Sequence, residues 1–173
     1  MNKLMWTVDN YGELYVDGNL WDTLTYTWAI KETTLPEVFS NLEVKASNHG
    51  GPAGFIGVLD LDGKIYPTNS NWDATSDLGS KKAFEIPDDF DPWSQYAGYL
   101  FAENLKKLGA KWIWWDEDSA MWDAPPKIVV FTTRMKEEAV AQPSQKVIAG
   151  IAIATVVSAA GIIALATSRR RGK

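Results

Sequence analysis

The sequence contains no cysteine and only one histidine, His49. Without cysteine the chain forms no disulfide, no thiolate nucleophile and no zinc–sulfur site. A single histidine cannot supply the paired imidazoles of a two-histidine metal site or a histidine relay. These absences disfavour most metalloenzymes and most hydrolases. We therefore expect a protein without catalytic residues, bound metal or cofactor.

Acidic residues are missing from the last 28 positions, which carry five lysines and arginines. The first 145 residues hold all 22 acidic residues and only 12 of the 17 lysines and arginines, which gives them a net charge of −10. Phosphate contacts need clustered cations, so nucleic acid is a poor partner for this acidic part. We expect nucleic-acid contact, if the protein makes any, only at a basic tail formed by Arg169, Arg170, Arg171 and Lys173.

An uncharged run of 22 residues, VIAGIAIATVVSAAGIIALATS, begins at Val147 and ends at Ser168. As a helix it would be about 33 Å long, which is enough to span the hydrocarbon core of a bilayer. A buried helix of a soluble domain is the alternative, but such helices usually keep a polar stripe. We therefore predict a single-pass membrane protein with one C-terminal transmembrane helix and the lipid bilayer as a partner.

Two signals disagree about the side of the membrane on which the larger part lies. The positive-inside rule places the basic tail in the cytoplasm and the larger part outside. The N-terminal residues MNKLMWTVDNYGELY, however, lack the apolar run of a signal peptide. Three arrangements remain: a signal removed before Met1, a tail anchor with its body in the cytosol, or the internal membrane of a virus.

Residues 1–133 read as mainly β, because short segments are rich in β-branched and aromatic residues. We expect strands over 4–8, 13–16, 24–30, 38–46, 55–61 and 127–133. Asp-Gly pairs between these segments favour tight hairpins, since both residues adopt positive φ. Strands about ten residues apart indicate an antiparallel sandwich. Only 95–108 has helical spacing, with Gly109 as its cap.

Residues 134–146 are poor in large apolar side chains and include Pro143, so we interpret them as a stalk. The predicted order is thus a β-sandwich over 1–133, a stalk over 134–146, a transmembrane helix over 147–168 and a basic tail over 169–173.

Four blocks of sequence carry a resemblance to a known family. They are DNYGELYVDGNLW from Asp9, LEVKASNHGGPAGFIGVL from Leu42, TNSNWDATS from Thr68 and AKWIWW from Ala110. In this order they resemble the galactose-binding-like jelly-roll domain, which occurs beside rhamnosidase-type glycoside hydrolases and in extracellular and viral proteins. The resemblance implies an antiparallel jelly-roll β-sandwich that accompanies catalytic domains without being one.

Tryptophans divide into expected core residues and candidate ligand contacts. A sandwich about 10 Å thick needs bulky filling, and we place Trp72, Trp112 and Trp114 inside it. The rings without an obvious core position are Trp21, Trp28, Trp93, Trp115 and Trp122. An exposed ring offers an apolar face to a sugar, but the same rings also suit a protein interface. His49, in a glycine-rich loop, is a further candidate, although a lone loop histidine is more often merely solvated.

The carboxylates of Asp116, Glu117 and Asp118, with Asp123 nearby, could gather around Ca²⁺. The glycine of a calcium-binding loop is missing, so we expect a solvated acidic loop and no metal site. No pair of acidic residues stands out as the acid and nucleophile of a glycosidase.

These observations predict a non-enzymatic, membrane-anchored structural or interaction protein. One interpretation is a minor capsid protein that tethers a viral shell to an internal membrane, with neighbouring capsid proteins as partners. The missing signal peptide, the missing cysteine and the basic tail favour it. The alternative is a carbohydrate-binding, lectin-like module displayed on a cell surface, with glycans as partners. The family resemblance favours this alternative, but fold analogy is a weak argument for function.

Overall fold

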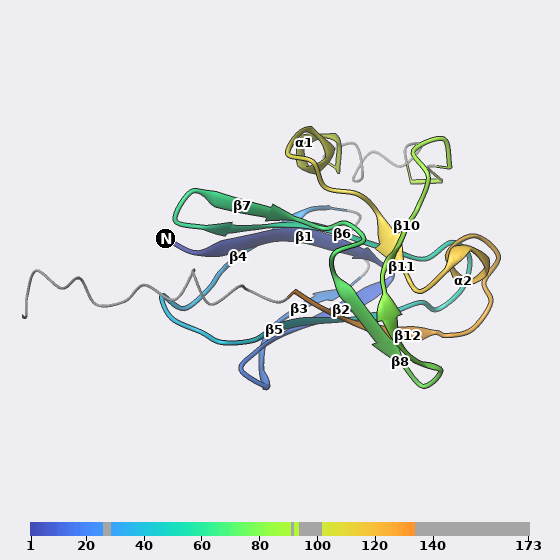
Figure 1. Cartoon of the computed structure of the whole chain (residues 1–173), viewed down its shortest axis with the longest axis horizontal. Helices are drawn as coiled ribbons and strands as arrows, with labels where there is room; N and C mark the ends of the chain where they lie inside the picture. Colours follow the sequence, from blue (N-terminus) through green and yellow to red (C-terminus); the bar gives the residue numbers. More distant parts are fainter. Residues whose placement is uncertain (26–28, 91, 94–101, 134–173) are drawn as a thin grey trace, which may run out of the picture. The chain divides into compact units, whose positions relative to one another are not determined.

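The computed structural model describes residues 1–25, 29–90, 92–93 and 102–133. They form two antiparallel β-sheets and two short helices, which confirms the mainly β prediction for this part of the chain (Figure 1). The chain divides into two compact units, Met1–Met135 and Lys136–Lys173, and the described residues belong to the first. None of the helices in the described ranges is long and apolar enough to cross a membrane. The predicted stalk, transmembrane helix and basic tail lie outside those ranges.

Each sheet contains six strands. Sheet A has the order β10-β11-β6-β1-β4, with β7 also paired to β6, and consists of β1 (Lys3–Asp9), β4 (Lys31–Thr34), β6 (Gly54–Leu61), β7 (Lys64–Pro67), β10 (Phe84–Glu85) and β11 (Ile113–Trp114). Sheet B has the order β3-β2-β5-β12-β8-β9 and consists of β2 (Tyr11–Val16), β3 (Asn19–Thr25), β5 (Leu42–Ser47), β8 (Asp73–Ser76), β9 (Gly79–Lys82) and β12 (Ile128–Thr132). The helices are α1 (Ala102–Lys107) and α2 (Glu117–Met121).

Four predicted strands are confirmed within two residues at either end, and they correspond to β1, β2, β6 and β12. The predictions at 24–30 and 38–46 have wrong bounds, because β3 ends at Thr25 and β5 begins only at Leu42. The sequence pattern misses the two-residue strands β10 and β11 and the four-residue strands β4, β7, β8 and β9. Strands β4, β8 and β9 are mostly polar, so they lack an apolar pattern.

Residues 38–41 form a loop because their backbone groups find partners outside a strand. The N–H groups of Ser40 and Asn41 donate to the carboxylate of Asp17 at 2.9 and 2.8 Å. Asp17 itself starts the turn between β2 and β3, so one aspartate closes both the hairpin and the neighbouring loop.

The predicted Asp-Gly hairpins are confirmed. Asp17 and Gly18 have φ of 49° and 76°, and Asp62 and Gly63 have φ of 51° and 89°. Both residues of each pair thus lie at the positive φ that a tight two-residue turn requires.

Helix α1 confirms the described part of the predicted helix, whose residues 95–101 lie outside the described ranges. Gly109 follows it with φ of 88° and donates its N–H to the Lys106 carbonyl at 2.9 Å. This is the expected glycine cap.

Aromatic rings from both sheets meet in the space between them. Phe55 of sheet A lies 5.3 Å from Phe131 of sheet B, and Trp114 of sheet A lies 5.8 Å from the same Phe131, measured between ring centroids. Trp72 meets Phe55 edge-on at 5.6 Å. Trp72, Trp112 and Trp114 are all buried, as predicted, but Trp112 stacks on Trp93 over the outer side of sheet A and does not fill the space between the sheets. Because rings of this size remove a large apolar area from water, this layer holds the two sheets face to face.

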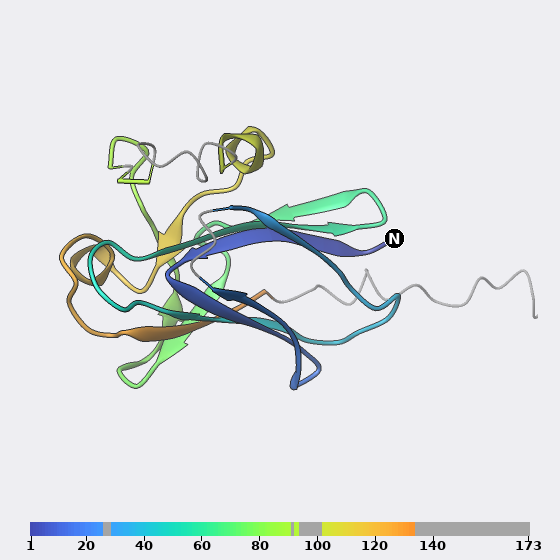
Figure 2. The same ribbon diagram turned by 180° about the vertical axis from the view of Figure 1, so that it is seen from behind.

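A second apolar layer covers the outer side of sheet A, where Figures 1 and 2 show α1 above β6 and β7. Trp93 and Trp112 stack there at 4.0 Å, over Gly54 of β6. A Cβ atom at Gly54 would lie 2.7 Å from Trp93 Cη2 and 2.8 Å from Trp112 Cε3. Glycine is therefore the residue that lets the stacked rings approach the strand.

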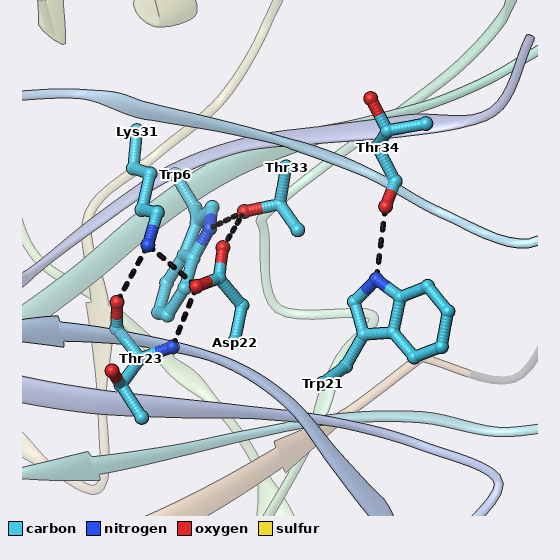
Figure 3. A network of polar contacts seen from close by, with 7 residues as sticks. All are labelled: Trp6, Trp21, Asp22, Thr23, Lys31, Thr33 and Thr34. Carbon is cyan, nitrogen blue, oxygen red and sulfur yellow. Dashed lines mark hydrogen bonds and ion pairs between the residues drawn. The ribbon is translucent and has the colours of Figure 1, made fainter.

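A polar network joins β3, at one edge of sheet B, to β4, at one edge of sheet A (Figure 3). The buried Trp6 indole donates to Thr33 Oγ1 at 3.1 Å, and that hydroxyl donates to Asp22 Oδ2 at 2.6 Å. Lys31 donates both to Asp22 Oδ1 at 2.5 Å and to the Thr23 carbonyl at 2.8 Å. Hydrogen bonds thus connect the edge strands β3 and β4 on this side of the sandwich. The Trp6 indole, the Thr33 hydroxyl, the Asp22 carboxylate and the Lys31 ammonium each have a partner in the network.

The Asp22 carboxyl is the centre of this network. Burial alone would raise its pKa, but the hydrogen bonds from Lys31, Thr33 and the Thr23 backbone outweigh burial and lower the pKa below 3.8. The ionised form is therefore the one that the fold stabilises. Its contribution to stability is present above pH 3.8 and is lost as the pH falls through the lowered value of the folded state.

We expect Asp22→Ala to lower the free energy of unfolding by about 1–3 kcal/mol at neutral pH, because Thr33 and Lys31 lose their common acceptor. Urea unfolding followed by tryptophan fluorescence measures this. Glu32→Ala is the control: Glu32 pairs with Lys3 at 3.0 Å on the surface, and its loss should cost less than about 1 kcal/mol. A cost for Asp22→Ala no greater than that of the control, or one that does not shrink in acid, would contradict the role of the network.

Candidate functional site

The outer side of sheet B is open in the part of the chain that the structure describes. Figure 1 shows α1 over sheet A and α2 beside the end of β11, and neither covers the opposite side of sheet B. Alternate residues of β2, β5 and β12 point inward and are buried, so the residues between them point outward.

Strand register arranges the outward residues in three rows across the sheet. The first row is Leu20, Tyr15, Glu43, Thr132, Asp73 and Lys82. The second is Thr23, Glu13, Lys45, Val130, Thr75 and Ser80. The third is Thr25, Tyr11, Ser47 and Ile128. We call these residues the sheet-B face; hydroxyls, paired charges and two tyrosine rings dominate it.

Two tyrosines, a glutamate and a lysine form the most connected cluster of the sheet-B face. Tyr11 and Tyr15 donate their hydroxyls to the two oxygens of Glu13, at 3.1 and 2.8 Å, and Lys45 of β5 donates to Glu13 at 3.0 Å. Burial alone would raise the pKa of this carboxyl, but the hydrogen bonds from the two tyrosines and the lysine outweigh burial and lower it. Glu13 is therefore a fixed anion that holds both rings in place.

Two hollows lie side by side on the same face and meet at Thr75. The first has a volume of about 620 Å³ and is lined by serine and threonine hydroxyls, by Asn41 and by the Asp73–Lys82 ion pair at 2.7 Å. The second, of about 530 Å³, is mostly apolar and is lined by Pro125, Pro126, Ile128 and Val130 among others. A ligand seated across Thr75 would meet polar groups on one side and apolar groups on the other.

The structure separates the tryptophans that were expected to be free of the core. Trp93 and Trp115 are 1% and 6% exposed, so that expectation is wrong for these two. Trp93 stacks on Trp112 as described, and the Lys81 ammonium lies 4.2 Å from the centroid of Trp115. Trp28 lies outside the described ranges.

Trp21 and Trp122 are the exposed candidates, at 48% and 73%. Trp21 donates its indole N–H to the Thr34 carbonyl at 2.9 Å beside the network of Figure 3. Trp122 follows α2, which bonds through Ala120 to Ala53 near the loop between β5 and β6. The two rings thus lie toward opposite ends of the strands and do not form a shared platform.

His49 is exposed, and its backbone N–H donates to Asn10 Oδ1 at 2.7 Å. The same asparagine donates to the Asp9 carboxylate, which also accepts the Trp93 indole N–H at 2.8 Å. Sequence candidates His49 and Trp93 are therefore joined through Asn10 and Asp9. The chain of hydrogen bonds includes the buried Asp9 carboxylate, which sequence analysis did not single out.

The expected acidic loop is instead the start of helix α2. Asp116 caps this helix: its carboxylate accepts the Ser119 backbone N–H at 3.0 Å and forms a capping box with the Ser119 side chain. It also pairs with Lys81 at 3.3 Å. No group of three metal-ligating side chains occurs among the described residues.

Sequence reasoning missed the cluster around Glu13. The segment YGELY contains the signal, because alternate residues of a strand share a face and Tyr11, Glu13 and Tyr15 are spaced by two. Lys45 could not be found in this way, since its position depends on the register between β2 and β5.

Comparison with models of protein families, with curated proteins and with solved structures finds no match to the chain. Statements about function therefore rest on the amino-acid sequence and on the chemistry of the described residues.

For the Asp9 carboxyl we expect a contribution to stability that depends on pH in the direction opposite to that of Asp22. Burial raises its pKa above 3.8, against the lowering effect of the hydrogen bonds from Trp93 and Asn10. The contribution of Asp9 to stability is therefore greatest when Asp9 is protonated and falls as the pH rises from 3.8 through the raised value. We expect the wild type to lose stability relative to Asp9→Asn over this range, measured by urea unfolding at several pH values. The Asp22→Ala comparison should change in the opposite direction, and a shared direction would contradict the assignment.

Proposed function

We propose that the protein is a non-enzymatic, single-pass membrane protein in which residues 1–133 form a binding head. The observation that carries the proposal is the uncharged run of 22 residues after a unit that closes its own core. A run of that length suits the hydrocarbon core of a bilayer. The core of the head does not require this run, because sheets A and B already cover the aromatic layer from both sides.

We also infer that the head is a jelly-roll β-sandwich of the galactose-binding-like type. Two facing antiparallel sheets and the buried rings Trp72, Trp112 and Trp114 support this inference, together with the order of the four sequence blocks.

The point where the chain leaves the head supports a tether. Strand β12 starts opposite Ser47 and ends opposite Glu43, so Thr133 lies at the end of the sandwich that carries the Asp17-Gly18 turn.

The first candidate role of the head is structural, as a link between a membrane and a protein layer such as a viral capsid. Its partners would be neighbouring structural proteins. The exposed rings of Trp21 and Trp122 support this role, because aromatic side chains are enriched at protein interfaces. The basic tail from Arg169 to Lys173 would lie on the other side of the bilayer. There its positive charges would be attracted to the phosphates of packaged nucleic acid.

The second candidate role is carbohydrate recognition at a cell surface. A specific observation favours it: the sheet-B face combines a hollow lined by hydroxyls with two fixed tyrosine rings. Sugar sites characteristically combine an apolar face with a few placed polar groups.

Vesicle flotation tests the anchor. We expect the full chain, reconstituted with phosphatidylcholine vesicles, to float with them in a density gradient, and residues 1–133 alone to remain at the bottom. Val157→Asp places a charge at the middle of the run, which costs about 2.5–3.5 kcal/mol in a membrane helix, and should reduce the floating fraction.

Val38→Asp is the matched control, because Val38 is a 76% exposed residue of the head and its change should leave flotation unaltered. Circular dichroism establishes that each variant is folded. A full chain that stays in solution without detergent or vesicles would contradict the anchor.

A further inference from the structure

Four of the five charged residues of the sheet-B face form ion pairs with one another. Glu13 pairs with Lys45 at 3.0 Å, and Asp73 pairs with Lys82 at 2.7 Å. The fifth charged residue, Glu43, accepts the side-chain amide of Asn41 at 2.8 Å. A charged ligand would have to break these pairs or face the excess carboxylate, so the face suits a ligand without charge.

Tyrosines on the face are oriented by Glu13. Tyr11 and Tyr15 are four residue steps apart along β2, which is about 13 Å at roughly 3.3 Å per step. Because both hydroxyls reach the same carboxylate between them, the rings lean toward one another along β2. Their polar atoms are already bonded, and what remains for a ligand is the half-buried ring surface.

The remaining outward positions are rich in hydroxyl groups. Thr132, Thr75 and Ser80 line the polar hollow, and Thr75 and Ser80 share a hydrogen bond at 3.0 Å. Hydroxyls both donate and accept, so they match the hydroxyls of a sugar in either direction. Six strands spaced about 4.8 Å apart give the face a width of roughly 24 Å, enough for more than one sugar unit.

We propose that the sheet-B face is a binding site for a neutral oligosaccharide, which lies across the strands from Tyr15 on β2 to Thr75 on β8. The tyrosine rings contact the apolar faces of sugar units, and the hydroxyls around Thr75 bond the sugar hydroxyls. This inference rests on the second candidate role of the head and is independent of the membrane anchor.

A protein partner fits this face less well. The centres of protein interfaces are depleted of lysine, glutamate, aspartate and serine, and all four occur in the rows of the face. An acidic glycan or nucleic acid fits less well too, because the first 145 residues have a net charge of −10.

The test uses the full chain in a zwitterionic detergent, since a detergent with a sugar headgroup would compete for the site. The probe is a printed panel of neutral oligosaccharides of hexoses and N-acetylhexosamines, with sialylated and sulfated counterparts. We expect the protein to bind neutral members of the panel selectively. Titration calorimetry with the neutral oligosaccharide that binds best should show an affinity about tenfold weaker for Tyr15→Ala than for the wild type.

Thr75→Arg is the second variant, because it blocks the junction of the two hollows at an exposed position and removes no core contact. It should weaken binding similarly. Leu108→Ala, a 44% exposed residue after α1, is the control and should bind as the wild type does. Thermal unfolding of each variant establishes that the head is folded.

Two results would overturn the inference in distinguishable ways. Binding that survives both Tyr15→Ala and Thr75→Arg would reject this site but keep carbohydrate recognition as a role of the head. Failure of every oligosaccharide to bind, or a preference for the acidic ones, would reject the neutral-sugar site and count against the second candidate role. The flotation result stands apart from both.

Discussion

The register of β2 on β5 is the constraint on which the rest of the head depends. Tyr15 lies opposite Glu43, and Leu14 lies opposite Val44. A slip of one residue would turn every side chain of β2 to the other side of the sheet. Leu14 and Val16 would then leave the core, and Glu13 would be buried away from Lys45. One alignment therefore sets both the apolar layer between the sheets and the polar surface outside them.

Local sequence predicts the elements whose geometry is local. Strand β6 follows from a run rich in β-branched and aromatic residues, and the Asp62-Gly63 turn follows from the positive φ that an Asp-Gly pair adopts. Strand β9, with the sequence GSKK, has no such signal, because it is a strand only through its pairing with β8. The burial of Trp93 could not be predicted either: its indole bonds to Asp9, which is 84 residues earlier in the chain. The same limit applies to the candidate site, where YGELY is readable but Lys45 is not.

Two aspartates show how environment decides the charge state that a fold favours. Asp22 is surrounded by the Lys31 ammonium, a hydroxyl and a backbone N–H, and its ionised form is stabilised. Asp9 accepts hydrogen bonds from an indole and an amide, and burial opposes its charge. Asp22 connects the edges of the two sheets through partners within 11 residues of it, whereas Asp9 connects β1 to Trp93, 84 residues later, in the layer over sheet A.

The edges of sheet B determine whether neighbouring copies of the head can pair strand to strand. On β3 the Thr23 carbonyl is occupied by Lys31, and a bulge interrupts the ladder opposite Leu14 and Tyr15. At the other edge, β9 ends in Lys81 and Lys82. Irregular and cationic borders of this kind prevent strand-to-strand zippering between neighbouring molecules. Neighbouring copies of residues 1–133 would therefore not join into a continuous fibril through the edges of sheet B.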